Sequence, residues 1–296
     1  MEINNRKTRL KDSLKILAEL TKIKITSFVT LTTAFGFIAA AHEINLNIIP
    51  VLFGILFMAC GSAAINHYQE KDFDALMNRT KNRPIPSGRI KPINVLLIAA
   101  ILIISGSVIL ITGSGILAFG LAVLNLFWYN VVYTLFKRKS PFAIIPGSLV
   151  GAIPPMAGWA AAGGSPFDPQ ILIIAFFLFI WQIPHFWLLL LALDADYRQA
   201  GFPTLTQIFS KEQLIRITLI WMISTVATGL LIPLFGLVHI PVINVLLFFG
   251  GVWLTWNAFK LLNETGNDLI FKIAFRDINV FALFVVIMVS ADKLIK

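Results

Sequence analysis

Three oxygen-bearing side chains recur every four residues where a long apolar segment of the chain ends. Asn66, Glu70 and Asp74 follow the apolar run 48–65 with no turn residue between. If the helix continues past Ile65, each of the three is rotated about 40° from the one before, so they share one face. Carboxylate and amide oxygens are ligands that suit Mg²⁺, which commonly completes its shell with substrate phosphates. The spacing therefore predicts a Mg²⁺ site, with these three residues as metal ligands, that holds a diphosphate.

The chain that follows this motif is basic. Arg79, Arg83 and Arg89 are available to fork around phosphate oxygens, a geometry that the guanidinium group matches well. Asp72 points to another side of the predicted helix, so we interpret it as a solvated or salt-bridged side chain. The competing interpretation of the whole stretch is an ordinary charged helix end. Ionisable groups next to membrane depth nevertheless favour a functional role.

A second polar group closes a later apolar segment. Gln182 and His185 lie inside that segment, on either side of Pro184, and Asp194 and Asp196 stand at its end. Eleven residues of continuous helix would bring Asp196 to within about 20° of His185 around the axis, with Asp194 nearly opposite. We therefore predict that Asp196 is the inward carboxylate and a further metal ligand. For His185, a hydrogen bond between helices is the alternative to ligand binding.

The elements that carry these groups must be membrane helices. The 296 residues are 57% hydrophobic and 13% charged, with a mean hydropathy of +0.83. A spanning helix needs about 20 mostly apolar residues, which predicts an all-α integral membrane protein, a bundle of nine transmembrane helices, and excludes a soluble globular domain. The nine apolar stretches are centred near Phe35, Phe57, Ile103, Leu124, Ala152, Phe179, Thr225, Gly250 and Val285. Residues 1–24 are predicted to form a basic cytoplasmic segment, either an interfacial helix or a mobile tail, and residues 25–296 a single domain.

The 24 Lys and Arg residues are concentrated in alternate connections between the apolar stretches. Cytoplasmic loops carry the excess of Lys and Arg, which predicts a cytoplasmic N-terminus and, after nine spans, a C-terminus outside. The expected location is the cell (inner) membrane, with the acidic motifs and the active site facing the cytoplasm. Topology also accounts for the net charge of +9, so no nucleic acid is expected as a partner.

The two acidic motifs resemble the superfamily of UbiA-type intramembrane prenyltransferases. The resemblance rests on the Asn66, Glu70 and Asp74 run, on the basic segment 83–89 behind it, and on a second acidic motif four spans later. Further strings resemble the haem farnesyltransferase branch of that superfamily. They are 74–80, Tyr133-Thr134 with Lys137-Arg138, 151–155 with Gly158-Trp159, 181–186, and 196–198 with Ala200, Gly201 and Pro203. The similarity covers roughly residues 20–290.

This resemblance implies a prenyltransferase with Mg²⁺ as cofactor and catalytic roles for Asn66, Glu70, Asp74 and Asp196. It implies transfer of a farnesyl group from farnesyl diphosphate to a vinyl group of protoheme IX, with water addition, giving haem O and diphosphate. The bilayer and an enzyme that further modifies haem O are the other partners it implies. Three further cations would bind either the diphosphate or the haem propionates, and the sequence does not assign each cation to one of the two: Lys137, Arg138 and Arg198. Three other side chains would contact substrate: Tyr133, Gln182 and His185.

One departure from the wider superfamily concerns the second motif. Ala192 and Ala200 occupy the positions four before and four after Asp196, so a second carboxylate pair is absent and the number of metal ions stays open. Two alternative functions also stay open. A prenyltransferase acting on an aromatic or quinone-precursor acceptor would share the diphosphate site. A polytopic transporter would instead place its polar groups near the bilayer midplane.

Overall fold

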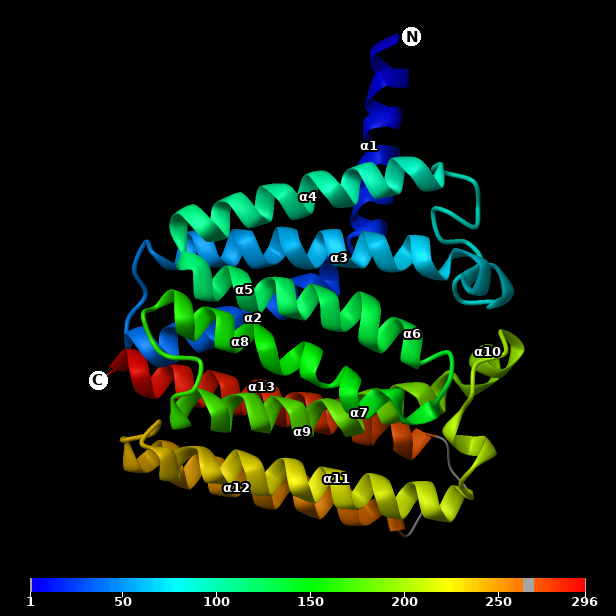
Figure 1. Ribbon diagram of the computed structural model, residues 1–296. Coiled ribbons are helices and arrows are strands. Elements are labelled where there is room, and N and C mark those ends of the chain that lie inside the picture. The colour runs from blue at the N-terminus through cyan, green and yellow to red at the C-terminus, as the bar shows by residue number, and fades with distance from the viewer. Residues whose placement is uncertain (1, 263–268, 296) are drawn as a thin grey trace.

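The computed structural model describes residues 2–262 and 269–295 (Figure 1). Within these ranges the chain is helical and contains no strand. Nine helical stretches in the described ranges are long and apolar enough to cross a membrane. The prediction of an all-α membrane protein with nine spans is therefore confirmed.

Most spans are single helices, and two are assembled from shorter pieces. The single helices are α2 (Ile23–Ala41), α3 (Ile48–Leu76), α4 (Pro92–Gly113), α9 (Pro169–Ala192), α11 (Lys211–Leu231), α12 (Pro241–Phe259) and α13 (Leu269–Ile295). The fourth span joins α5 (Gly115–Phe127), a π-helical segment (Trp128–Tyr133) and α6 (Thr134–Phe136). The fifth joins a 3₁₀ turn (Pro141–Ala143), α7 (Ile144–Gly147) and α8 (Leu149–Ala161). Pro92, Pro169 and Pro241 stand in the first turn of their helices, where a missing N–H costs nothing.

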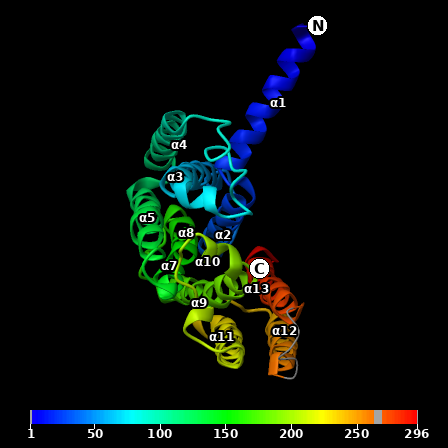
Figure 2. The ribbon, with the colours of Figure 1, turned by 90° about the vertical axis from the view of Figure 1, so that its right-hand side faces the viewer.

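The first helix lies outside this bundle. Helix α1 (Glu2–Leu20) projects away from the other helices in both views (Figures 1 and 2). Its last turn is anchored, because Leu20 is fully buried against α3 and α4, and Glu19 accepts a hydrogen bond of 3.2 Å from Arg89. A position of this helix in the headgroup layer stays a prediction.

Helix α3 is 29 residues long and continues to Leu76, so the predicted continuation past Ile65 is confirmed. The helix ends at Met77, whose backbone is extended. Thr80 then folds back and donates its hydroxyl hydrogen to the backbone oxygen of Asp74 at 2.9 Å. The last turns of α3 are thus held in helical geometry, which fixes the phase of every polar residue on them.

The second acidic motif does not continue its helix. Helix α9 ends at Ala192, Leu193 leaves helical geometry, and the separate helix α10 (Asp194–Gln199) begins after it. The expected rotation between His185 and Asp196 assumed one continuous helix and is therefore wrong. Pro184 lies within α9 and does not end the helix. The ends of α3, α6 and α9 and the whole of α10 gather at one end of the bundle, on the right in Figure 1.

Helices α2 and α8 approach so closely that each presents a glycine to the other's backbone. A Cβ atom on Gly36 would lie 1.9 Å from the backbone oxygen of Pro155, and one on Gly158 would lie 2.0 Å from that of Thr33. Small residues that let backbones meet are typical of helix packing in membranes, where there is no hydrophobic drive between helices. This contact sets the separation of two helices that line the site described next.

Candidate active site

A cavity of about 340 Å³ lies inside the bundle and is polar at one end. Its apolar wall comes from α2, α3 and α5, and its polar end from the last turns of α3 and the segments around them. The apolar lining includes Val29, Ile55, Met58, Ala63, Ala122 and Leu126, and the charged lining includes Lys22, Glu70, Asp74, Arg79, Arg83 and Lys137. Such a shape suits a molecule with an anionic head and a hydrocarbon tail.

The three oxygen-bearing residues of α3 all line this cavity, each paired with a cation. The Nζ atom of Lys22 donates to Oδ1 of Asn66 at 2.6 Å, and Lys137 pairs with Glu70. Arg83 donates to both carboxylate oxygens of Asp74 at 2.8 Å. Asn66, Glu70 and Asp74 are no more than 5% exposed. Buried carboxylates persist only when paired, so Lys137 and Arg83 stabilise the two carboxylates of α3 in the bundle interior.

Lys22 is a cation of the site that the sequence pattern did not single out. It lies 44 residues before Asn66 and takes a left-handed backbone conformation, φ 48°, at the start of α2. Its Nζ atom also donates to the Tyr129 hydroxyl at 3.2 Å. Burial, followed by repulsion from Arg83, lowers the pKa of Lys22 to about 7. In the sequence this charge served only as a topology signal, because nothing local links it to the acidic motif.

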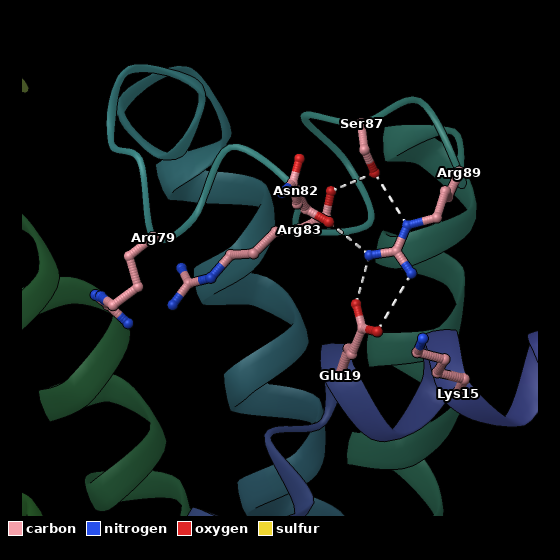
Figure 3. Close-up of a pocket in the computed structure, with 7 residues that line it drawn as sticks. All are labelled: Lys15, Glu19, Arg79, Asn82, Arg83, Ser87 and Arg89. Atoms are coloured by element: carbon pink, nitrogen blue, oxygen red, sulfur yellow. Dashed lines mark hydrogen bonds and ion pairs between the residues drawn. The ribbon is translucent and has the colours of Figure 1, made fainter.

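The three arginines predicted to bind phosphate, which follow the first motif in the sequence, lie in two different places. Arg79 and Arg83 line the buried cavity and also a second, open pocket of about 490 Å³ (Figure 3). Arg89 lines only the open pocket and is engaged with Glu19, Ser87 and the backbone oxygen of Asn82. Arg79 and Arg83 therefore lie between the cavity and the open pocket, whereas Arg89 binds the loop after α3 to Glu19 of α1.

Lys137 and Arg138 are adjacent in sequence, but their side chains bind different residues of α3. Lys137 reaches the cavity, where it pairs with Glu70 and lies 5.6 Å from the ring centre of Tyr133, another predicted residue that lines the cavity. Arg138 instead donates to the backbone oxygen of Gln69 at 2.7 Å and covers the ring of Phe73 at 4.9 Å. The structure thus brings Lys137 to the cavity, whereas Arg138 contacts Gln69 and Phe73 of α3 and does not line the cavity.

Asp196 is not among the residues that line the cavity. Its Oδ2 atom accepts a hydrogen bond of 3.2 Å from the backbone N–H of Arg79. Asp196 therefore links α10 to the segment that follows α3. Arg198 pairs with Asp194 at 2.8 Å and does not line the cavity. The same segment reaches the cavity through Tyr197 and Phe202. The predicted metal role of Asp196 therefore stays a prediction, whereas Asn66, Glu70 and Asp74 are assembled on one wall.

The remaining predicted residues lie on α9. Gln182 lines the cavity, and its buried Oε1 atom has no hydrogen-bond partner among the described residues. His185 does not line the cavity and makes a 2.7 Å hydrogen bond to Asn279 of α13. The interhelical hydrogen bond expected for His185 is therefore present, and a role of His185 in substrate binding stays a prediction. Asp72 is exposed, as the helical phase predicted.

Known proteins share the sequence pattern and the fold of this chain. A profile of the UbiA prenyltransferase family matches residues 28–278. A protein of Mesorhizobium japonicum called protoheme IX farnesyltransferase 2 is 33% identical over 90% of this chain and 86% of its own. Among solved structures, one of digeranylgeranylglyceryl phosphate synthase has a TM-score of 0.78 with 18% identity and covers 96% of this chain and 100% of that chain. A UbiA homologue from Archaeoglobus fulgidus bound to GPP and Mg²⁺ has a TM-score of 0.68 with 15% identity and covers 93% and 99% of the two chains. The match over most of the chain shows that this protein belongs to the UbiA prenyltransferase family.

Proposed function

We propose that this prenyltransferase moves a farnesyl group from farnesyl diphosphate to a vinyl group of protoheme IX, with water addition, giving haem O and diphosphate. The observation that carries the diphosphate half is the polar end of the cavity, where three oxygens of α3 face Lys22, Arg83 and Lys137. The acceptor is supported by relatives such as the one from Mesorhizobium japonicum, which carries the name protoheme IX farnesyltransferase 2.

The residues on α3 fit Mg²⁺ in kind and number. Two buried carboxylates and an amide oxygen, one helical turn apart, face the cavity, and among the described residues no group of three His, Cys, Asp or Glu forms a closed cage. Mg²⁺ typically uses one or two carboxylates and takes its other ligands from phosphates and water. Asn66, Glu70 and Asp74 would hold the ion, and the bound ion would neutralise charge that grows on the leaving diphosphate.

Basic side chains of the protein would bind the diphosphate alongside the metal ion. When a diphosphate enters, Lys22, Arg83 and Lys137 have a second anion within reach and can turn from the α3 oxygens to phosphate oxygens. As the allylic carbon–oxygen bond breaks, these pre-placed donors stabilise the departing charge. The vinyl group supplies the electron pair for the new carbon–carbon bond, and water adds to the remaining vinyl carbon and loses a proton. The apolar wall between α2, α3 and α5 would hold the farnesyl tail and keep other water away.

The assay that tests this proposal uses purified protein with protoheme, labelled farnesyl diphosphate and Mg²⁺. We expect label in a product that has the mass of farnesylated, hydrated protoheme, together with released diphosphate. Pigment extracted from the protein as isolated should contain haem. Transfer of label to a quinone precursor but not to protoheme would overturn the acceptor and leave the diphosphate site standing.

Metal removal should stop turnover. In excess chelator we expect the transfer rate to fall to background and to return when Mg²⁺ is added, because the hard oxygens of α3 and the diphosphate share the ion. The measurement is the initial rate of labelled product formation. Undiminished turnover in excess chelator would remove the metal role from Glu70 and Asp74.

We also propose that the polar end of the cavity faces the cytoplasm of the cell membrane. Reporters placed within residues 136–141 should then map inside, and a reporter after residue 296 should map outside, because Lys and Arg alternate between the connections. Accessibility of the fused reporters in intact cells checks both positions. Both reporters on the same side would contradict this topology.

A further inference from the structure

The hydrogen bond between His185 and Asn279 fixes which nitrogen of the imidazole carries the proton. The Nδ2 atom of Asn279 donates to the backbone oxygen of Phe275 at 2.6 Å, which places the amide oxygen toward His185. That Oδ1 atom lies 2.7 Å from Nδ1 of His185 and is only an acceptor. With this amide orientation Nδ1 is the donor, and the neutral imidazole is the tautomer protonated at Nδ1. Nε2 is left with a lone pair.

Aromatic rings surround this imidazole, and among the described residues no charged side chain is paired with it. The ring centres of Trp181, Phe186 and Phe275 lie 4.9, 5.4 and 4.9 Å from that of His185. His185 is half-buried, and in the described part of the chain no hydrogen bond uses its Nε2 atom. A histidine whose other ring nitrogen donates to a carbonyl oxygen is typical of metal ligands, because that bond orients the ring and raises its basicity.

The ring lies directly behind the wall of the cavity. Gln182 and Phe186, three residues before and one residue after it on α9, both line the cavity. The Phe186 ring contacts the imidazole on one side and stacks with Tyr133, another lining residue, at 6.2 Å on the other. A group bound at Nε2 would therefore lie beside the space that holds the allylic diphosphate.

The number of metal-binding side chains near His185 indicates what kind of metal group could bind there. One imidazole does not hold a bare metal ion, and no group of three His, Cys, Asp or Glu exists among the described residues to complete a shell. A metal that arrives inside a macrocycle brings its own equatorial nitrogens and needs only an axial ligand. Flat aromatic side chains around the site suit a large planar ring.

We propose that His185 binds the iron of the porphyrin acceptor through Nε2, with Asn279 as its positioning residue. This inference rests on the proposed function, since it concerns how that acceptor is held. Ligation would anchor the porphyrin next to Phe186 and present its edge to the cavity. The other three described histidines are placed differently. His42 caps the C-terminal end of α2, His67 is buried away from the cavity lining, and His239 lies against Asp292.

The test compares binding of ferric protoheme and of metal-free protoporphyrin IX to purified full-length protein. Absorption and electron paramagnetic resonance spectra of the wild-type complex should show a nitrogen axial ligand. His185→Ala should lose this signature and bind protoheme at least about 10-fold more weakly, and added imidazole should restore the spectrum. Asn279→Leu should weaken protoheme binding by roughly 10- to 100-fold, the range for loss of a residue that orients a ligand. Both variants should bind protoporphyrin IX as the wild type does, which also shows that they are folded.

His239→Gln serves as the matched control and should leave the spectrum unchanged. If His185→Ala kept the nitrogen signature and the affinity for protoheme, the axial-ligand inference would be overturned while farnesyl transfer still stood. Equal weakening of protoheme and protoporphyrin binding would assign His185 to packing and would also overturn it. If the wild type neither bound protoheme nor transferred farnesyl to it, the proposed function would fail first.

Discussion

Asp74→Asn is expected to lower the rate of prenyl transfer by roughly 10²-fold or more, by analogy with removal of one charge-stabilising group from an active site. Asp74 is fully buried, lines the cavity and receives both hydrogen bonds of Arg83. The amide has the same size but no charge, so it weakens the proposed Mg²⁺ site and leaves the packing in place. The Arg83 side chain is 22% exposed, so water can partly compensate its lost partner and the protein should stay folded. Initial rates and the yield of folded protein in detergent measure the two effects.

Asp72→Asn is the matched control for this prediction. Asp72 lies two residues earlier on the same helix and is exposed, so the same change of charge should reduce the rate less than about twofold, in keeping with substitutions away from buried networks. Equal damage from both variants would show that charge near the helix end, and not the α3 ligand face, determines the rate. Glu70→Gln should resemble Asp74→Asn, because Glu70 is buried in the same cavity with Lys137 as its partner.

Gly158→Ala is expected to prevent most of the protein from folding. The added methyl carbon would lie 2.0 Å from the backbone oxygen of Thr33 and 2.9 Å from the backbone nitrogen of Phe37. Backbone atoms of α2 cannot rotate away as a side chain can, so the two helices must separate. Overpacking in a well-packed interior costs about 1–3 kcal/mol, and more where backbone must move. The fraction of monodisperse protein after solubilisation, and its thermal unfolding midpoint, should both fall.

Gly120→Ala provides the comparison for the same chemical change. Gly120 is exposed on α5, and a Cβ atom there would meet no atom within 4 Å. Alanine is about 1 kcal/mol better than glycine inside a helix, so this variant should fold at least as well as the wild type. A normal yield of Gly158→Ala would contradict the close approach of α2 and α8.

Local periodicity accounts for what could be predicted from the sequence. Nine apolar stretches predict nine spans because the bilayer sets their length, and i, i+4, i+8 spacing predicts that Asn66, Glu70 and Asp74 share a face because the helix repeats every 3.6 residues. The exposure of Asp72 follows from the same phase. The argument failed at Asp196, where the helix breaks at Leu193, because phase is lost at any break that the sequence does not announce.

Only the tertiary structure decided the pairing of distant residues. Lys22 meets Asn66 across 44 residues of sequence, and adjacent Lys137 and Arg138 bind different residues of α3, because packing between helices has no periodic signature in the chain. The lone pair on Nε2 of His185 is likewise set by Asn279, 94 residues away. The sequence determined which faces carry chemistry, since that depends on local helical geometry. Tertiary packing determined which cation meets which oxygen, since long-range contacts alone bring those groups within hydrogen-bonding distance.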